Sequence, residues 1–233
     1  MASNVTTGDP ETAAKTGGAN TESLARIVDT LEEDIVFGRL HQNERLIEDD
    51  LMARFGVKRH VIRQTLADLE RIGIVERIPN RGSRVRAFSP EIINQLYVVR
   101  ELLETSAVRL VPFPLPAGTL DRLRAVQDVH DKAVDEEDLH RVFRSNIEFH
   151  RTLFELCNNP FLAATINEYA FRTHGIRFYS MTSPADLQRA RAEHHQMIEA
   201  LEYADRDNLI EICKRHLLPA KERYLRMARA PSA

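Results

Sequence analysis

The chain has 233 residues, a mass of 26.7 kDa and a formal net charge of −3. Its 43% hydrophobic and 29% charged residues are typical of a globular protein, and no apolar run approaches the roughly 18 residues that span a membrane. The N-terminus lacks the basic and apolar segments of a secretory signal, and the sequence contains only two cysteines. We therefore expect a soluble, cytoplasmic protein with one large or two modest domains and no membrane partner.

The first part of the chain changes from a featureless segment to a helical pattern. Residues 1–21 are rich in Ala, Thr, Gly and Asn and have no hydrophobic period, so we expect a flexible tail. Helical spacing then begins at Leu24 and predicts a helix that ends near Gly38. We interpret residues 40–46 as a short connector.

Residues 51–70 have the pattern of two short helices joined by a tight turn. Their apolar positions follow a helical period that is broken once, at Gly56, where the chain can turn without a steric penalty from Cβ. After the turn, Arg59 and Arg63 lie one helical turn apart near the start of the second helix. This arrangement is typical of a helix-turn-helix whose second helix enters the major groove of DNA.

The negative net charge hides a local basic region around this motif. Between residues 54 and 86 there are nine basic and three acidic residues, which gives a local net charge of +6. A confined basic surface favours DNA binding, because neutralising phosphates supplies much of the non-specific affinity. The alternative is a charged face that is simply solvated.

Residues 74–85 have the pattern of a β-hairpin next to the second helix. Short runs with β-branched residues flank the turn formers Pro79, Asn80 and Gly82. We interpret this hairpin as a β-wing. Arg81 at its tip and Arg84 on its return strand would reach phosphates or a minor groove.

The rest of the chain lacks strand signals and predicts an all-helical bundle. Proline, asparagine and acidic breaks divide it into six predicted helices: 89–111, 117–135, 137–157, 159–180, 184–203 and 205–229. The expected fold is therefore mainly α, with an N-terminal winged helix-turn-helix and a C-terminal six-helix bundle.

Several polar side chains fall on the apolar, inward stripes of these helices. They are Asn146 and His150 in the third bundle helix, His194 in the fifth and His216 in the last. An unpaired buried polar group costs on the order of 1–3 kcal/mol, so these residues require partners. Hydrogen bonds within the core would satisfy a single histidine, whereas a shared divalent metal such as Zn²⁺, Ni²⁺, Fe²⁺ or Mn²⁺ would satisfy all four residues.

Two further features of the bundle leave alternatives open. Cys213 precedes His216 by three residues and is either another metal ligand or a small buried hydrophobic residue. Arg100 and Glu104 lie four residues apart on the first bundle helix, either as a surface ion pair or with Arg100 binding a ligand carboxylate.

The sequence resembles transcriptional regulators of the GntR superfamily, FadR-type subfamily, with an FCD ligand-binding domain. The N-terminal resemblance rests on residues 51–66, 69–75 and 79–85, and the C-terminal resemblance on residues 99–104, 148–153, 193–201 and 216–217. A bundle of six helices rather than seven is similar to that of the VanR-like branch of this subfamily. The resemblance covers about residues 24–229. Together with the composition of the tail at 1–21, it gives a DNA-binding domain at 22–88 and an effector-binding and dimerisation domain at 89–229.

The resemblance also implies roles for individual residues. It implies that Arg59 and Arg63 read bases or phosphates, that Lys58 and His60 contribute nearby, and that Gly82 shapes the wing tip. It implies a metal held by Asn146, His150, His194 and His216. Two positions depart from the family pattern: Asn146 stands where aspartate is usual and should weaken metal binding or change the metal held, and Asp49 stands where arginine is frequent and removes one phosphate contact.

The sequence therefore predicts a regulator and not an enzyme. In the favoured hypothesis a homodimeric repressor binds a palindromic double-stranded DNA operator and senses a small carboxylate effector at a divalent metal, with Zn²⁺ the most readily observed. The alternatives are a metal-dependent hydrolase with a DNA-binding appendage and an architectural DNA-binding protein whose bundle only dimerises. No nucleophile elbow, phosphate loop or catalytic carboxylate pair accompanies the histidines, which disfavours the hydrolase.

Overall fold

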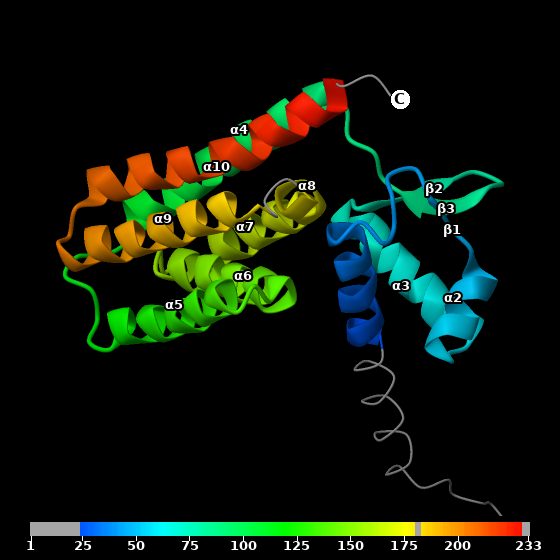
Figure 1. Ribbon diagram of the computed structural model, residues 1–233, viewed down its shortest axis with the longest axis horizontal. Helices are drawn as coiled ribbons and strands as arrows, with labels where there is room; N and C mark the ends of the chain where they lie inside the picture. The colour runs from blue at the N-terminus through cyan, green and yellow to red at the C-terminus, as the bar shows by residue number, and fades with distance from the viewer. Residues whose placement is uncertain (1–23, 180–182, 230–233) are drawn as a thin grey trace, which may run out of the picture. The chain divides into compact units, whose positions relative to one another are not determined.

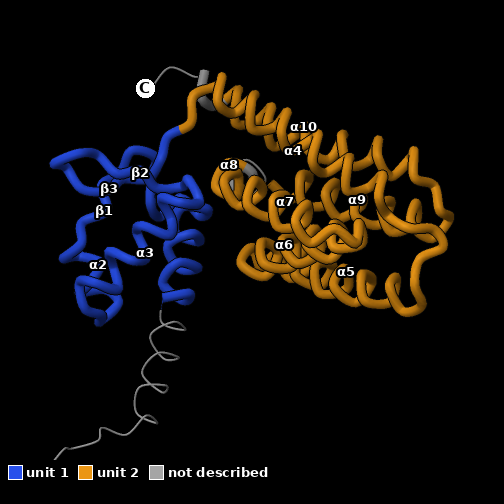
Figure 2. Tube along the Cα trace, turned by 180° about the vertical axis from the view of Figure 1, so that it is seen from behind, with its two compact units in different colours: residues 1–87 blue, residues 88–233 orange. Residues whose placement is uncertain are grey.

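The structure, a computed structural model, describes residues 24–179 and 183–229. The predicted flexible tail at residues 1–21 lies outside the described residues. Contacts divide the chain into two compact units, residues 1–87 and 88–233 (Figure 2).

The first unit contains the predicted helix-turn-helix. Residues 24–36 are helical, and α2 (Glu48–Phe55) and α3 (Arg59–Ile72) follow. Both of the latter helices end at a glycine in the left-handed conformation, Gly56 with φ 65° and Gly73 with φ 96°. The buried side chains of α3 are Val61, Ile62, Thr65, Leu66 and Leu69. One face of α3 therefore packs on the unit's core and leaves the opposite face to solvent.

A small antiparallel sheet completes the first unit. The strands are β1 (Arg45–Leu46), β2 (Val75–Ile78) and β3 (Gly82–Val85), in the order β1-β3-β2. Ile78 pairs with Gly82 across the hairpin turn, as the predicted wing requires. The prediction that residues 40–46 form only a connector was wrong, because Arg45 and Leu46 pair with β3. A two-residue strand is too short to produce a detectable alternation in the sequence.

The second unit is a helical bundle (Figure 1). Its helices are α4 (Pro90–Leu110), α5 (Thr119–Asp135), α6 (Leu139–Glu155), α7 (Pro160–Arg172), α8 (His174–Tyr179), α9 (Pro184–Glu202) and α10 (Arg206–Arg229). The helices α4, α7 and α9 each begin with proline after a Ser or Asn whose side chain accepts a backbone hydrogen bond. This combination of cap and proline fixes where each helix starts.

The core of the bundle is formed mainly by α6, α9 and α10, together with α4. Phe149 and Leu153 of α6 pack with Met197 and Leu201 of α9 and with Leu209 of α10, and each is at most 2% exposed. The long helices α4 and α10 lie side by side, and α5 packs against α6 and α9 (Figure 1). The mainly α fold predicted from the sequence is confirmed.

The predicted single helix at 159–180 is divided into α7 and α8. The break falls at Thr173, which has φ −106° and ψ 3° and whose hydroxyl donates to the carbonyl of Ala170 at 2.9 Å. A hydroxyl that bonds the preceding turn competes with the helical backbone pattern. The described part of the bundle thus has seven helical segments and not six, so the helix count no longer supports the VanR-like branch.

Among the described residues, every helix is too short or too polar to cross a membrane.

Candidate metal centre and nucleic-acid interface

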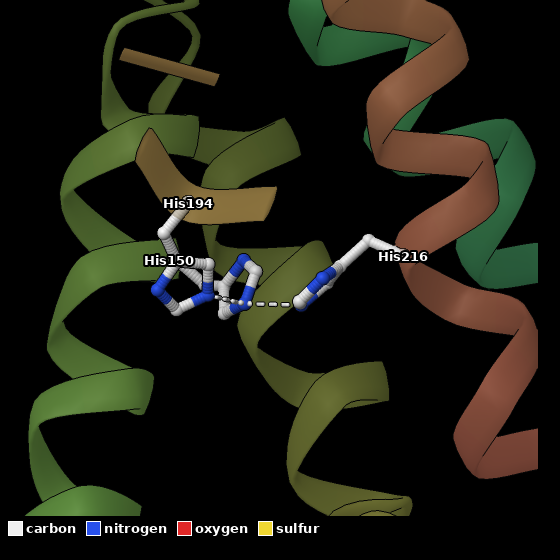
Figure 3. A group of neighbouring side chains, drawn as sticks. All are labelled: His150, His194 and His216. Atoms are coloured by element: carbon white, nitrogen blue, oxygen red, sulfur yellow. Dashed lines mark hydrogen bonds between the residues drawn. The ribbon is translucent and has the colours of Figure 1, made fainter. Parts of the chain in front are cut away.

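Three histidines from three helices meet inside the bundle (Figure 3). His150 comes from α6, His194 from α9 and His216 from α10. The Nε2 atom of His150 lies 3.3 Å from Nε2 of His194 and 3.2 Å from Nε2 of His216. His194 and His216 are 0% and 5% exposed, whereas His150 is partly exposed, so the cluster is reached from the side of His150.

A chain of hydrogen bonds fixes the orientation of His194. Gln127 on α5 donates from Nε2 to a carboxylate oxygen of Asp131 at 2.7 Å, which leaves its Oε1 facing Nδ1 of His194 at 3.0 Å. Because that oxygen can only accept, we assign the hydrogen of His194 to Nδ1 and a lone pair to Nε2. The ring also stacks on Phe149, with centroids 4.0 Å apart and an interplanar angle of 11°.

A carboxylate fixes the orientation of the His216 ring. The Nδ1 atom of His216 lies 2.6 Å from Oε2 of Glu193, a buried residue of α9. Burial acts to raise the pKa of Glu193, but the hydrogen bond with His216 and the nearby charges of His216, Arg189 and Arg215 outweigh it and lower the pKa. Glu193 is therefore an anionic acceptor for a hydrogen on Nδ1 of His216, and when that imidazole is neutral its Nε2 presents a lone pair.

The three ring nitrogens cannot all satisfy one another. Two lone pairs, from His194 and His216, converge on Nε2 of His150, which can donate only one hydrogen. The candidate ligand atoms of the three residues lie within 4.8 Å of one another. Imidazole nitrogens directed at one point, with those of His194 and His216 backed by an acceptor on the other ring nitrogen, form a donor set that suits Zn²⁺ and neighbouring divalent ions.

The other two candidate ligands behave differently. Asn146 lies one turn before His150 on α6 and is buried, so it stays a candidate fourth ligand. Cys213 is 2% exposed within the apolar core cluster. Burial and, secondarily, the charge of Glu104 raise the pKa of its thiol strongly, which disfavours the thiolate that metal binding requires. Of the two alternatives for Cys213, the buried hydrophobic residue fits the structure.

A cavity of about 250 Å³ lies beside His150. Its wall includes Arg100 and Glu104 of α4, with Phe154, Phe171 and His174 from the facing helices. Arg100 and Glu104 form an ion pair in which both side chains are only 4% exposed. The alternative of a surface ion pair is therefore wrong, because both charges are buried and border the same cavity as a candidate metal ligand.

In the first unit, the residues predicted to contact DNA occupy the exposed side of α3. Lys58 is the N-cap residue, Arg59 and His60 lie on the first turn of α3, and Arg63 lies one turn later. Arg59 contacts Asp49 at 2.5 Å and Glu48 at 3.3 Å, and Nε of Arg63 lies 3.0 Å from Glu48. Both arginines therefore form ion pairs with acidic residues at the start of α2.

The wing carries the remaining predicted DNA contacts. Arg81 is exposed in the turn, and Gly82 has φ 82°, a left-handed conformation that favours glycine. Arg84 lies on the return strand β3, as predicted, and its Nε lies 2.5 Å from a carboxylate oxygen of Glu76 on β2. Glu76 faces Arg84 directly in the register of the two strands, so this is a cross-strand pair.

Comparison with known proteins identifies the family. Residues 95–218 match the family model of the FCD domain, and residues 24–85 match that of the bacterial regulatory proteins of the gntR family. The chain is a GntR-family transcriptional regulator with an FCD domain. The two matched segments lie in the two compact units.

Proteins with similar sequences are also HTH-type transcriptional regulators. The regulator is 25% identical over 190 residues to YdhC of Bacillus subtilis, an HTH-type transcriptional regulator, covering 81% of this chain and 83% of YdhC. It is 22% identical over 194 residues to the HTH-type transcriptional repressor RspR of Escherichia coli, covering 82% of this chain and 84% of RspR. Because these relatives are regulators, the prediction that the chain is not an enzyme is confirmed and the hydrolase alternative is set aside.

Solved structures share the fold. The Escherichia coli protein McbR/YncC superposes with a TM-score of 0.71 at 20% identity, covering 88% of this chain and 96% of McbR. A GntR regulator from Rhodococcus sp. RHA1 gives the same TM-score at 23% identity and covers 87% and 97% of the two chains.

Sequence reasoning missed the residues that orient the histidines. Gln127 and Asp131, which orient His194, lie on α5, a helix that carries none of the predicted ligands. Sequence reasoning also missed Thr173, which accepts a hydrogen bond from Arg100. One signal was available for Gln127: it follows Leu123 by four residues and so falls on that helix's buried face. The same face contains His130.

Proposed function

We propose that this regulator is a homodimeric repressor that acts in the cytoplasm, binds a palindromic operator, and responds to a small organic acid at a metal site in its FCD domain. The observation that carries this proposal is the convergence of three imidazole nitrogens beside a cavity that also contains Arg100. The similarity to RspR, an HTH-type transcriptional repressor, supports repression as the direction of control.

The metal would be held by His150, His194 and His216, with Asn146 as the fourth ligand. When bound, such a metal supplies a Lewis-acidic position for a carboxylate. The residues of this chain orient the ligands: Gln127 and Glu193 hold two of the rings by their Nδ1 atoms. The buried guanidinium of Arg100, paired with Glu104 and bonded to Thr173, lies at the cavity wall, where its remaining N–H groups would recognise a second oxygen of the acid.

On the DNA side, Arg59 and Arg63 would read the operator from the major groove, with Lys58 and His60 beside them. Arg81, Gly82 and Arg84 would place the wing against the backbone or the minor groove. Two copies of α3 in a two-fold symmetric dimer match a palindromic site. Ligand-dependent coupling of about 1–3 kcal/mol would change operator affinity by about 5–150-fold.

The metal part is tested by elemental analysis of the purified protein. We expect one divalent metal per chain in the wild type and substoichiometric metal in His150→Ala and His194→Ala, with His140→Ala, an exposed histidine on α6, as the matched control. Wild-type protein that gains no metal when incubated with excess Zn²⁺ would refute the metal site.

The DNA part is tested on a duplex selected from random sequence by the full-length protein. We expect Arg59→Ala and Arg63→Ala each to weaken binding by about tenfold or more, in line with the roughly 1–3 kcal/mol of a specific base contact. If both variants bind the selected duplex as tightly as the wild type, α3 is not the recognition helix. Sedimentation of the protein with the duplex gives the number of chains bound and tests the dimer.

A further inference from the structure

We infer that this regulator has a second ligand site, formed by α9 and α10, that binds inorganic phosphate or the phosphate group of a small molecule. The site shares no residue with the three histidines or with the cavity beside His150. Binding of a phosphate there is therefore independent of the proposed metal and of the proposed organic acid.

A second cavity, of about 410 Å³, lies where the first turns of α9 meet the second half of α10. Its wall consists of Pro219 and five charged residues: Asp186, Arg189, Glu222, Arg223 and Arg226. Three guanidinium groups and two carboxylates give this wall a net charge of +1. A cavity with this charge favours an anionic ligand.

Asp186 holds two of the three arginines in place. Its side chain is only 15% exposed, and its Oδ1 lies 3.0 Å from Nη1 of Arg189. Its Oδ2 contacts Nη1 of Arg223 and accepts a hydrogen bond from the hydroxyl of Ser183 at 2.6 Å. Both carboxylate oxygens of Asp186 are thus used within the protein, and the two guanidinium groups are positioned before any ligand arrives.

The arginines retain donors that the protein does not use. Arg189 and Arg223 each contact Asp186 through Nη1, and none of the described residues accepts a hydrogen bond from Nη2 of either side chain. Nη1 of Arg226 lies 3.7 Å from Glu222, which is beyond hydrogen-bond distance, and this side chain is 69% exposed. Donors from both helices are therefore available to oxygen atoms of a ligand in the cavity.

The number of these donors favours phosphate over carboxylate. A single guanidinium fork already engages both oxygens of a carboxylate, whereas a phosphate offers at least three oxygens and can accept from three arginines at once. A phosphate monoester also carries about 1.5–2 negative charges near pH 7, more than a carboxylate does. The wall of three arginines therefore matches phosphate in both geometry and charge.

The size of the cavity indicates how large the ligand is. A volume of about 410 Å³ equals roughly fourteen water molecules at about 30 Å³ each. Pro219 is the uncharged part of the wall, so little apolar surface is available to bind a large hydrocarbon group. The expected ligand is inorganic phosphate or a phosphate monoester with a few carbon atoms.

Calorimetry on the full-length protein at constant ionic strength tests this site. The probes are inorganic phosphate and glycerol 3-phosphate, with acetate as the control anion. We expect at least one of the two phosphates to bind with a dissociation constant of about 1 mM or tighter. If neither phosphate binds saturably, the second site does not exist.

The variant His150→Ala separates this site from the candidate metal centre. It removes a candidate metal ligand and should bind the phosphate probe as tightly as the wild type does. In this variant acetate should bind at least about tenfold more weakly than the phosphate, and equal affinities would refute the preference for phosphate. Loss of phosphate binding in His150→Ala would place the anion at the metal centre and overturn the second site.

Arginine variants assign the binding to the cavity. Arg189→Gln and Arg226→Gln should each weaken phosphate binding by at least about fivefold, in line with the loss of a hydrogen bond between charged groups. Arg109→Gln, which removes an exposed arginine of α4, should leave it unchanged. Wild-type affinity in both cavity variants would overturn the assignment. If Arg189→Gln does not fold, the result for the mostly exposed Arg226 decides.

A duplex of random sequence distinguishes a small phosphate from the DNA backbone. We expect Arg226→Gln and Arg109→Gln to bind this duplex equally well. A selective loss of duplex affinity in Arg226→Gln, with a weaker dependence on salt concentration, would show that Arg226 contacts DNA phosphates. In that case the cavity is part of the DNA-binding surface, and the assignment to a small ligand is wrong.

Discussion

Oε1 of Gln127 lies 3.0 Å from Nδ1 of His194, and the amide is held in that orientation by the carboxylate of Asp131. One helix, α5, thus determines which nitrogen a histidine on another helix presents to the candidate metal centre. Partners of this kind raise the basicity of a ligand and restrict its ring, and their loss commonly costs about 10–100-fold in metal affinity.

The first prediction concerns this contact. Gln127→Ala should lower Zn²⁺ affinity by about 10–100-fold while leaving all three histidines in place. The measurement is competition for Zn²⁺ against a fluorescent chelator, with Asp128→Ala, the exposed neighbour on α5, as control. Equal affinities for Gln127→Ala and the wild type would show that the contact is not important for metal binding.

A second prediction concerns the acidic residues that contact the recognition arginines. Asp49 lies 2.5 Å from a guanidinium nitrogen of Arg59, and its side chain is 71% exposed. Asp49→Asn should bind the selected duplex about two- to fivefold more tightly, because DNA phosphates then compete with one carboxylate fewer and a surface pair contributes at most about 1 kcal/mol.

Asp50→Asn is the control for this prediction, since Asp50 is an exposed neighbour on α2. Both variants remove one negative charge, so a general charge effect would strengthen binding equally in both. The assay is a fluorescence anisotropy titration at several salt concentrations. Weaker DNA binding by Asp49→Asn would instead mean that Asp49 positions Arg59 for the operator.

A third prediction concerns the buried ion pair between Arg100 and Glu104. Removing one partner leaves the other charge buried and unpaired, so Arg100→Leu should lower the free energy of unfolding by about 3–5 kcal/mol. The double variant Arg100→Leu/Glu104→Leu should recover most of that loss. Urea denaturation of the single and double variants measures the coupling, and additive losses would contradict it.

A fourth prediction concerns the reactivity of Cys213. Because burial raises the pKa of its thiol well above neutrality, the group stays protonated at pH 8 and should not react with iodoacetamide in the native protein. Mass spectrometry should find alkylated Cys213 only after denaturation. Rapid alkylation of native protein upon removal of the metal by a chelator would revive Cys213 as a ligand.

The local features of this protein were predictable from sequence because they depend on residues close together in the chain. Gly56 ends α2 where the helical period breaks, and Arg59 begins the next helix as the spacing indicates. Prolines and caps located the starts of α4, α7 and α9 within a residue. The inward faces of α6, α9 and α10 followed from their apolar period, so the three histidines could be chosen one by one.

Only the tertiary structure decided how these residues meet. Periodicity shows which face of a helix is buried, but it shows neither which helices pack against that face nor how they are rotated. The sequence could therefore suggest that His150, His194 and His216 lie close together, but it could not give the distances between them. The contact of Arg100 with Thr173 and the pairing of Arg45 with Arg84 depend on partners distant in sequence. The roles of Gln127 and Glu193 depend on hydrogen bonds between helices, which follow from packing that no local pattern encodes.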